Sequence, residues 1–338
     1  MISLILSGKL ALSTAAAVAG TLFLLISGAA ASEKNLLRAV VGIETTISPD
    51  ARTARILGTQ RQGSGVVIDD EGLVLTIGYL ILEADGAVIT GPNGKTVPAT
   101  VVAYDFETGL GLLRLMQKLD VTPLRLGDSS QLGMRDQVVI AARGGPQPIS
   151  AARVVSRRIY TGYWEYMLER AIFTAPPYGF HSGAALVGQN GRLLGIGSLL
   201  VNDAVAPDVP SPGNMFVPVN GLKPVLADLL QSGRRSGRKR PWIGANTIEA
   251  NGRLFVIRVT PNGPADAAGI KAGDLILGLS GRPIESQQDF YRRLWRSGEP
   301  GTEININILP KGASDLTIKK KTIKAGDRYD WLKIKRSY

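Results

Sequence analysis

Between Ala39 and about Val219 the chain alternates short apolar segments with turn-forming residues, and this pattern limits the folds open to it. Hairpin turns are expected at residues 69–72 (DDEG), 91–94 (GPNG) and 189–191 (QNG), because Gly and Asn tolerate the positive φ that such turns require. Forty glycines and nineteen prolines, with 6% aromatic residues, favour short strands over long helices. Many short antiparallel strands in one segment predict a sandwich or a pair of β-barrels. The expected strands are Ala39–Thr45, Gly65–Ile68, Leu73–Thr76, Ala87–Thr90, Val97–Ala103, Gly111–Leu115, Gln137–Ala142, Ile149–Ile159, Ile172–Thr174, Ala184–Val187 and Leu193–Leu200.

The segment after this β-rich region predicts a linker and a second, smaller domain. Asn220–Gln231 has helical spacing of its leucines, and Ser232–Arg240 has no core-forming residue, so we expect the linker there. Beyond it, apolar strand-like segments alternate with two segments of helical character, which indicates a small α+β domain. The strands are expected at Trp242–Ala245, Leu254–Thr260, Leu275–Ser280 and Ile304–Ile308, and the helices at Pro264–Ala268 and Ser286–Arg296.

The N-terminal segment has the pattern of an export signal. Lys9 is the one charged side chain between Met1 and Glu33, and Leu10–Gly28 is a run of apolar and small residues followed by Ala29–Ala31. This order is typical of a secretory signal cleaved near Ala31. Nineteen residues in a helix would span roughly 28 Å, so an uncleaved membrane anchor is the alternative. Both place the bulk of the protein outside the cytoplasm.

The net charge of +11 is concentrated in two segments. Five of these charges lie in the expected linker, and residues 319–338 supply the remainder. The linker cations are Arg234, Arg235, Arg238, Lys239 and Arg240. We expect solvated, flexible basic segments, with attraction to an anionic membrane surface as the alternative and nucleic acid not expected as a partner.

The absence of cysteine and the presence of a single histidine restrict the chemistry. Without cysteine there are no disulfides, thiol nucleophiles or thiolate metal sites. His181 alone cannot build a histidine-rich metal centre, and Ser/His catalysis would have to use this one imidazole. No metal and no organic cofactor is indicated.

Several motifs together resemble the HtrA/Deg family of periplasmic trypsin-like proteases. The resemblance rests on 63–69 (GSGVVID), 72–76 (GLVLT), 101–110 (VVAYDFETGL) and 181–196, which contains HSGAALV and GRLLGI. Residues 240–244 (RPWIG) and 263–277 (GPADAAGIKAGDLIL) resemble the PDZ domain of the same family. The match covers about residues 38–325 and implies a mainly β fold, a chymotrypsin-like double antiparallel β-barrel followed by a small α+β PDZ domain.

The resemblance also assigns the catalytic positions, and two of the three carry other residues. Tyr79 stands at the general-base position and Gly109 at the acid position, whereas Ser182 stands at the nucleophile position. At the oxyanion-hole position, formed with Ser182, Phe180 replaces the family's glycine. A serine without a neighbouring base is a poor nucleophile, and a tyrosine with a pKa near 10 does not readily accept its proton.

His181 is the alternative base for Ser182. Neighbouring side chains on extended backbone point to opposite faces, and they diverge in a tight turn, so we expect His181 to pack or to face solvent instead. Ser182 is then a vestigial serine. Asp105 and Glu107 lie near the acid position, but the resemblance gives them no catalytic role.

The PDZ-like domain implies peptide binding by strand addition, with loop N–H groups holding a terminal carboxylate. The resemblance makes the carboxylate loop Trp242, Ile243, Gly244 and Ala245, and places the peptide between the following strand and the Ser286–Arg296 helix. Ile243, Phe290 and Leu294 are expected to line the pocket for an apolar terminal side chain, with ordinary core packing as the alternative for the last two.

The resulting domain boundaries are a signal peptide or membrane anchor at 1–31, a double barrel at 36–231, a basic linker at 232–240, a PDZ domain at 241–327 and a basic tail at 328–338. Three functional hypotheses remain. The first is a catalytically inactive envelope protein that binds peptide C-termini or unfolded chains, as a homo-oligomer or assembled with an active relative. The second is an active serine endopeptidase with a rearranged site around Ser182, and the third is a membrane-surface scaffold.

Overall fold

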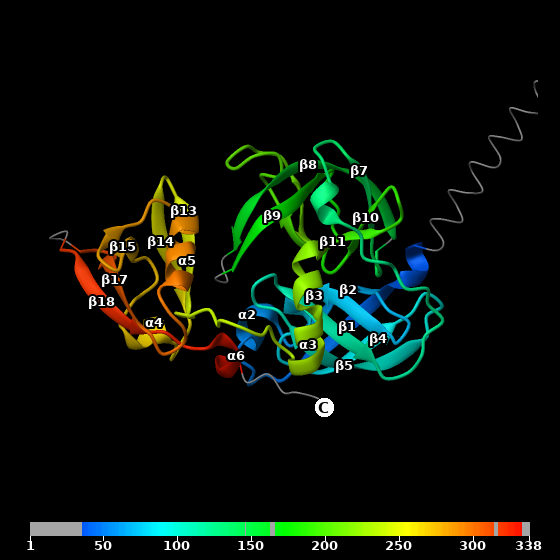
Figure 1. Cartoon of the computed structure of the whole chain (residues 1–338), viewed down its shortest axis with the longest axis horizontal. Helices are drawn as coiled ribbons and strands as arrows, with labels where there is room; N and C mark the ends of the chain where they lie inside the picture. Colours follow the sequence, from blue (N-terminus) through cyan, green and yellow to red (C-terminus); the bar gives the residue numbers. More distant parts are fainter. Residues whose placement is uncertain (1–35, 146, 163–165, 314–316, 333–338) are drawn as a thin grey trace, which may run out of the picture.

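The strand and turn pattern forms two closed barrels of six antiparallel strands each, rather than a sandwich (Figure 1). The structure, a computed structural model, describes residues 36–145, 147–162, 166–313 and 317–332, so the expected signal or anchor segment lies outside the described residues. The first barrel has the strand order β1-β2-β3-β6-β5-β4 and closes because β1 also pairs with β4. Its strands are β1 (Val40–Ile47), β2 (Gln60–Val67), β3 (Leu73–Ile77), β4 (Ala84–Thr90), β5 (Thr96–Tyr104) and β6 (Leu110–Leu115).

The second barrel follows the same scheme in the order β10-β11-β12-β9-β8-β7 and closes where β10 pairs with β7. Its strands are β7 (Gln137–Ala141), β8 (Ile149–Gly162), β9 (Tyr166–Ala175), β10 (Ala185–Gly188), β11 (Leu193–Val201) and β12 (Gly213–Pro218). Short helical segments connect the strands and close the barrel unit. They are α2 (Ala54–Leu57), η1 (Gly78–Leu80), η2 (Ser129–Gln131), η3 (Val219–Gly221), η4 (Lys223–Val225) and α3 (Leu226–Ser232).

Alternation along the strands produces the barrel interior. In β1 the side chains of Ile43, Thr45 and Ile47 are buried while the intervening Glu44 and Thr46 are exposed, as expected for a strand with one face inward. A Cβ added at Gly65 of β2 would lie 2.7 Å from the Ile43 side chain and 2.6 Å from Val74, so the interior leaves room only for glycine there.

The C-terminal domain is an antiparallel sheet in the order β13-β14-β15-β17-β18, with β16 paired to β15. Helix α5 covers the sheet and begins at Ser286, whose hydroxyl accepts a hydrogen bond from the Asp289 N–H at 3.0 Å. Its apolar stripe of Phe290, Tyr291 and Leu294 is fully buried. The elements are β13 (Ala245–Ala250), β14 (Arg253–Val259), α4 (Pro264–Ala267), β15 (Leu275–Leu279), β16 (Arg282–Pro283), α5 (Gln287–Arg296), β17 (Glu303–Leu309), β18 (Lys319–Lys324) and α6 (Arg328–Trp331).

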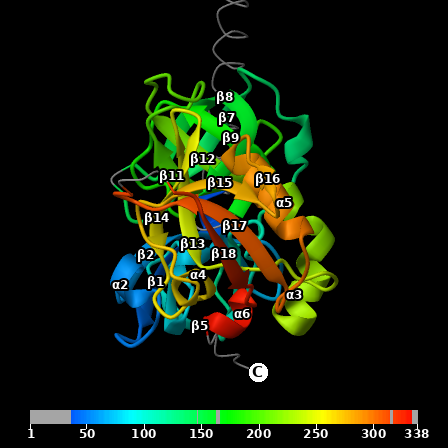
Figure 2. The same ribbon diagram turned by 90° about the vertical axis from the view of Figure 1, so that its left-hand side faces the viewer.

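The chain end returns to the first barrel, which ties the two parts of the molecule together (Figure 2). Residues 328–331, at the start of the expected basic tail, form α6. The Tyr329 hydroxyl donates to the Tyr104 carbonyl at 2.8 Å, and its ring packs edge-on against Phe106 at 4.4 Å between centroids. The C-terminal domain is therefore attached to the barrel at both of its ends, through the segment after α3 and through α6.

Candidate active site

The candidate site lies where the two barrels meet. The loop between β9 and β10 carries Ser182, and the carbonyl of Ser182 accepts a hydrogen bond from the Ser64 N–H of β2 at 2.8 Å. Gly183 has φ +73°, and a Cβ there would collide with the Ser64 carbonyl oxygen, so this turn requires glycine. A tight turn pinned to the other barrel thus fixes the position of the Ser182 side chain.

The partner of the Ser182 hydroxyl is a phenol. Tyr79, from η1 in the first barrel, places its hydroxyl 2.9 Å from Ser182 Oγ and 2.8 Å from the carbonyl oxygen of Ser198. The Tyr79 hydroxyl is the donor toward both oxygens, so its single proton is shared between Ser182 Oγ and the Ser198 carbonyl. The sequence could not assign Ser198 to the site, because it contributes through its backbone.

The surroundings of Tyr79 keep its phenol hydroxyl protonated and neutral. Burial raises the pKa of Tyr79 to about 12, and the hydrogen bond with Ser182 opposes this only in part. A neutral phenol oxygen is a very weak base. The hydrogen-bond partner of Ser182 Oγ therefore has little capacity to remove the serine proton.

His181 points elsewhere. Its Nδ1 lies 3.2 Å from the carbonyl oxygen of Gly179, and burial lowers the pKa of the ring below its usual value. The imidazole is thus held against the backbone of its own loop, while the hydroxyl of Ser182 bonds to Tyr79.

Gly109 lies in a turn that presents no acid to the site. Its φ is +77°, its N–H donates to the Asp105 carbonyl at 2.7 Å, and its own carbonyl accepts from the Gly78 N–H at 2.7 Å. The nearby carboxylate of Asp105 is buried and engaged with Arg235, at 2.6 Å and 2.7 Å. This loop therefore holds the linker rather than orienting a base.

Phe180 lies beside Ser182 with 44% of its surface exposed. Its ring covers Gly145, where an added Cβ would lie 2.6 Å from the ring. A cleft of about 600 Å³ opens next to Ser182 and Phe180, and much of its lining is glycine and backbone. Peptide-sized molecules can therefore reach the neighbourhood of the serine hydroxyl.

The residues expected to line a peptide pocket in the C-terminal domain are buried instead. Ile243, Phe290 and Leu294 each have 0% exposed surface and belong to the hydrophobic core of this domain. The expectation of an open apolar pocket formed by these three side chains is thus not met in this structure, because α5 packs directly on the sheet. Core packing, the alternative for Phe290 and Leu294, describes them correctly.

The expected carboxylate loop is also engaged. The N–H of Trp242 donates to the Gly326 carbonyl at 2.9 Å, and the Trp242 carbonyl accepts from the Gly326 N–H at 2.8 Å. Gly244 adopts φ +75°, and Ala245 is 1% exposed at the start of β13. The Trp242 amide is therefore already paired with the segment that follows β18.

The edge of β13 is covered by a glutamine. The side-chain amide of Gln287 donates to the Thr247 carbonyl at 2.8 Å and accepts from the Thr161 hydroxyl of β8 at 2.8 Å. Nearby, Arg292 of α5 pairs with Glu169 of β9 at 3.2 Å. The β8–β9 hairpin of the second barrel thus lies against α5 of the C-terminal domain.

Four of the five linker cations pair with carboxylates of the protein, which corrects the expectation of free, solvated charges, although Arg238 and Lys239 are exposed. Arg235 pairs with Asp105, Arg240 pairs with Glu107 at 2.8 Å, and Lys239 pairs with Asp327 at 2.9 Å. The guanidinium of Arg240 also lies 4.0 Å from the centre of the Trp295 ring. Sequence reasoning missed these carboxylate partners, although acidic residues close to the predicted acid position were the available signal.

No group of three or more His, Cys, Asp or Glu side chains that could hold a metal ion occurs in residues 36–145, 147–162, 166–313 and 317–332. Within the same ranges, no helix is both long and apolar enough to cross a membrane.

Comparisons with known proteins match both halves of the chain. Residues 63–196 match the trypsin-like peptidase domain, and residues 241–322 match the PDZ domain. The serine protease Do-like HtrB of Bacillus subtilis is 28% identical over 299 residues, covering 77% of this chain. The periplasmic serine endoprotease DegP of Salmonella typhimurium is 32% identical over 268 residues, covering 74% of this chain. The chain is a homologue of the HtrA and DegP serine proteases.

The structural comparison agrees with this assignment at the level of the fold. The HtrA-type protease AlgW with a decapeptide superposes with a TM-score of 0.53 at 21% identity, over 88% of this chain and 98% of that one. A serine endoprotease from Yersinia pestis gives 0.51 at 24% identity, over 88% and 96%. The double barrel and PDZ domain expected for this HtrA/DegP homologue are confirmed. The chain spans 62% of the length of HtrB and 54% of DegP.

Proposed function

We propose that this HtrA/DegP homologue is a pseudoprotease of the cell envelope that binds peptide C-termini or unfolded chains through its PDZ domain. In this role it acts as an adaptor, a chaperone-like protein or a regulator. The observation that carries the proposal is the contact at 2.9 Å between Ser182 Oγ and the hydroxyl of Tyr79, at the position where an active relative needs a base. We assign Ser182, Tyr79 and Gly109 to the former nucleophile, base and acid positions.

The size of the catalytic loss supports this reading. Removing triad members from serine proteases lowers the rate by about 10⁴ to 10⁶. Loss of one oxyanion-hole donor costs roughly another 3 kcal/mol of transition-state stabilisation, and we expect Phe180, in place of the glycine, to disturb that donor. A phenol whose pKa is raised by burial does not compensate for either loss.

Peptide binding would use the exposed edge of the PDZ sheet. An added strand pairs with main-chain groups of β13, the outermost strand in the order β13-β14-β15-β17-β18. The carbonyl of Thr247 on this strand is bonded to the Gln287 side chain, so a peptide has to displace that amide. The structure without peptide thus corresponds to a closed groove, and binding requires α5 to move away from β13.

The alternative function is an active serine endopeptidase of envelope protein quality control. Two observations favour it. The turn at Gly183 holds Ser182 in a fixed position, and the cleft of about 600 Å³ gives a polypeptide access to it. The curated relatives are also named as serine proteases.

Location and partners follow from the same assignment. Export to the periplasm, with or without an inner-membrane anchor, agrees with the names of the periplasmic relatives. Assembly with itself or with an active relative would bring this PDZ domain to a working protease. A membrane surface is less favoured than in the sequence analysis, because the linker cations Arg235, Lys239 and Arg240 pair with carboxylates of the protein itself.

A fluorophosphonate probe tests the two functions. The probe forms a covalent bond with an activated serine, so we expect no labelling of the full chain at Ser182 and no cleavage of casein, while DegP assayed beside it is labelled. The Ser182→Ala variant gives the background. Labelling or cleavage that disappears in Ser182→Ala would establish the endopeptidase and refute the pseudoprotease.

A further inference from the structure

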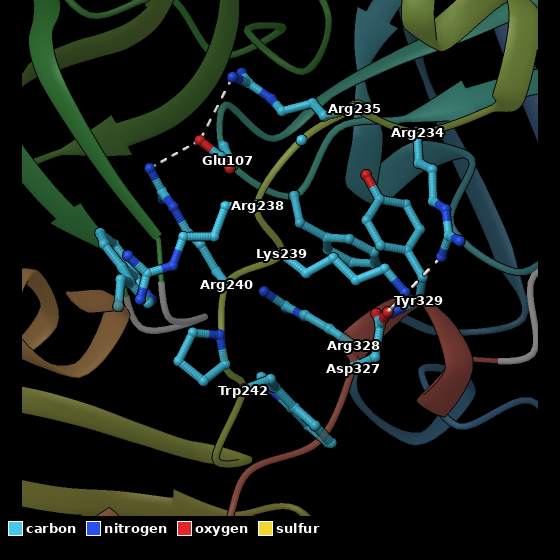
Figure 3. Close-up of a pocket in the computed structure, with 14 residues that line it drawn as sticks. Glu107, Arg234, Arg235, Arg238, Lys239, Arg240, Trp242, Asp327, Arg328 and Tyr329 are labelled. Atoms are coloured by element: carbon cyan, nitrogen blue, oxygen red, sulfur yellow. Dashed lines mark hydrogen bonds and ion pairs between the residues drawn. The ribbon is translucent and has the colours of Figure 1, made fainter. Parts of the chain in front are cut away.

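A pocket lies where the first barrel, the linker, the PDZ domain and α6 meet (Figure 3). Its volume is about 70 Å³, enough for a few water molecules or one small polyatomic ion. Phe106 and Glu107 come from the first barrel, and Trp242 and Trp295 come from the PDZ domain. Both domains therefore contribute walls to the same pocket.

Positive charge dominates the lining. The five linker cations Arg234, Arg235, Arg238, Lys239 and Arg240 all border the pocket. In the described part of the chain four of these five, all except Arg238, form ion pairs, and they share three carboxylates, those of Asp105, Glu107 and Asp327. Three carboxylates leave two of the five positive charges uncompensated.

Arg238 is the linker cation that has no carboxylate partner among the ion pairs of the described residues. Its guanidinium donates to two backbone carbonyl oxygens, of Arg296 and Gly298, both at 3.2 Å. Carbonyl groups orient a guanidinium but do not neutralise it. In Figure 3 its side chain is drawn beside that of Arg240 along the pocket, with Lys239 and Arg234 across from them.

Arg238 itself is exposed, but the arginines beside it are partly removed from water. The side chains of Arg234, Arg235 and Arg240 are only 24–35% exposed. Phe106, Trp242, Trp295 and Tyr329 add aromatic residues to the wall. Burial lowers the pKa of Arg240, which is the effect of removing a guanidinium from water. An anion in the pocket would relieve this unfavourable desolvation.

The shape of the pocket selects among anions. A flat membrane surface makes poor contact with cations that line a concavity, whereas a small ion can enter it. Guanidinium groups donate pairs of parallel N–H bonds that fit the oxygens of phosphate-like groups. We propose that this pocket binds a phosphoryl oxyanion, held by the linker arginines and Lys239. Because both domains line the pocket, the bound ion fastens the PDZ domain to the barrel unit.

Isothermal titration of the full chain with inorganic phosphate, in chloride buffer at constant ionic strength, tests the site. The Arg238→Gln variant removes a cation without stripping a carboxylate of its partner, and we expect it to weaken phosphate binding about tenfold. The Asp327→Asn variant is expected to change phosphate affinity in the opposite direction. It removes a competing negative charge, while its side-chain oxygen can still cap α6 at the Tyr329 N–H, so binding should tighten severalfold.

Arg253→Gln is the matched control. Arg253 is an exposed arginine of β14 outside the pocket, and its replacement changes the net charge by the same amount as Arg238→Gln. Phosphate affinity should be unchanged in this variant. Equal weakening in Arg238→Gln and Arg253→Gln, or no heat of phosphate binding by the parent chain at millimolar concentration, would overturn the proposal.

The source of the phosphoryl group is resolved by two further probes. Glycerol 1-phosphate should compete with inorganic phosphate if a free small molecule fits. Phosphatidylglycerol vesicles, compared with phosphatidylcholine vesicles, test whether a lipid headgroup can enter, with Arg238→Gln again distinguishing the pocket from general surface charge. Vesicle binding that is equally strong in Arg238→Gln, together with no competition by glycerol 1-phosphate, would assign the interaction to the surface and contradict a pocket.

Discussion

At the scale of single residues, the central feature is the contact between the Ser182 hydroxyl and the phenol of Tyr79. Tyr79 bridges the two barrels, because it belongs to η1 of the first and bonds Ser182 and Ser198 of the second. This side chain therefore serves as a structural link between the barrels. The link depends on the tyrosine remaining protonated.

The raised pKa of Tyr79 predicts a loss of stability in strong base. In the unfolded chain a tyrosine ionises near pH 10, whereas in the folded chain this one ionises near pH 12. Its contribution to the free energy of unfolding is thus complete below pH 10 and is lost as the pH rises from about 10 to 12. The loss is roughly 2–3 kcal/mol.

Urea unfolding at pH 8 and pH 11 measures this effect, with Tyr79→Phe as the comparison. Tyr79→Phe leaves the Ser198 carbonyl without its donor, so we expect it to be less stable at pH 8 by about 1–2 kcal/mol. Between the two pH values it should lose less stability than the parent chain. The prediction is wrong if both proteins lose the same amount.

At the scale of elements, α5 and β13 together decide whether the PDZ domain is open. The helix buries its whole apolar stripe on the sheet. In addition, the side-chain amide of Gln287 donates a hydrogen bond to the Thr247 carbonyl and so occupies the edge of β13. The same glutamine is bonded to Thr161 of β8, so the second barrel contributes to the closed state.

The Gln287→Ala variant should bind peptides more tightly. Removing the side chain frees the Thr247 carbonyl for an incoming strand, and we expect the affinity for a peptide with an apolar C-terminal residue to rise severalfold. Fluorescence anisotropy with a labelled peptide measures the change. Gln288→Ala, one position along the helix, is the control. Unchanged or weaker binding in Gln287→Ala would argue against a lock at this edge.

At the scale of the whole molecule, the linker fixes the position of the PDZ domain relative to the first barrel. The buried carboxylate of Asp105 in the first barrel receives a two-fold contact from Arg235, and α6 returns to the same loop region through Tyr329. The linker is short and four of its five cations pair with nearby carboxylates, so the PDZ domain is held at the barrel rather than tethered loosely.

The Arg235→Gln variant should destabilise the chain and release the PDZ domain. It leaves the Asp105 carboxylate, 1% exposed, without its charged partner, at a cost of about 3 kcal/mol. Adding Asp105→Asn should recover much of this loss, because the unpaired charge is then gone. Chemical denaturation measures the stability, and small-angle X-ray scattering measures the expected increase in radius of gyration.

Arg292→Gln is the control for this pair. Arg292 and Glu169 also connect the PDZ domain to a barrel, but their side chains are 39% and 61% exposed, so their contribution is about 0–1 kcal/mol. If Arg292→Gln destabilised the chain as much as Arg235→Gln, burial of the Asp105 pair would not be the cause.

The sequence by itself determined a region of many short strands, the smaller second domain and the family resemblance, which in turn implied the two barrels. Each of these rests on local patterns, such as alternating apolar residues, turn glycines and motifs of fixed spacing, which do not depend on distant contacts. The substitutions Tyr79 and Gly109 were readable in the same way, because they occupy fixed places in such motifs.

Only the tertiary structure decided what these residues contact. The bond from Tyr79 to the backbone of Ser198 joins positions 119 apart, and that from Arg235 to Asp105 joins positions 130 apart. The net charge of the segment therefore suggested a solvated linker. Folding, however, brings the carboxylates of Asp105, Glu107 and Asp327 next to its cations. The sequence could not decide the role of Phe290 and Leu294 for a similar reason. Apolar residues on one face of a helix have the same spacing whether that face lines a binding groove or packs in a core.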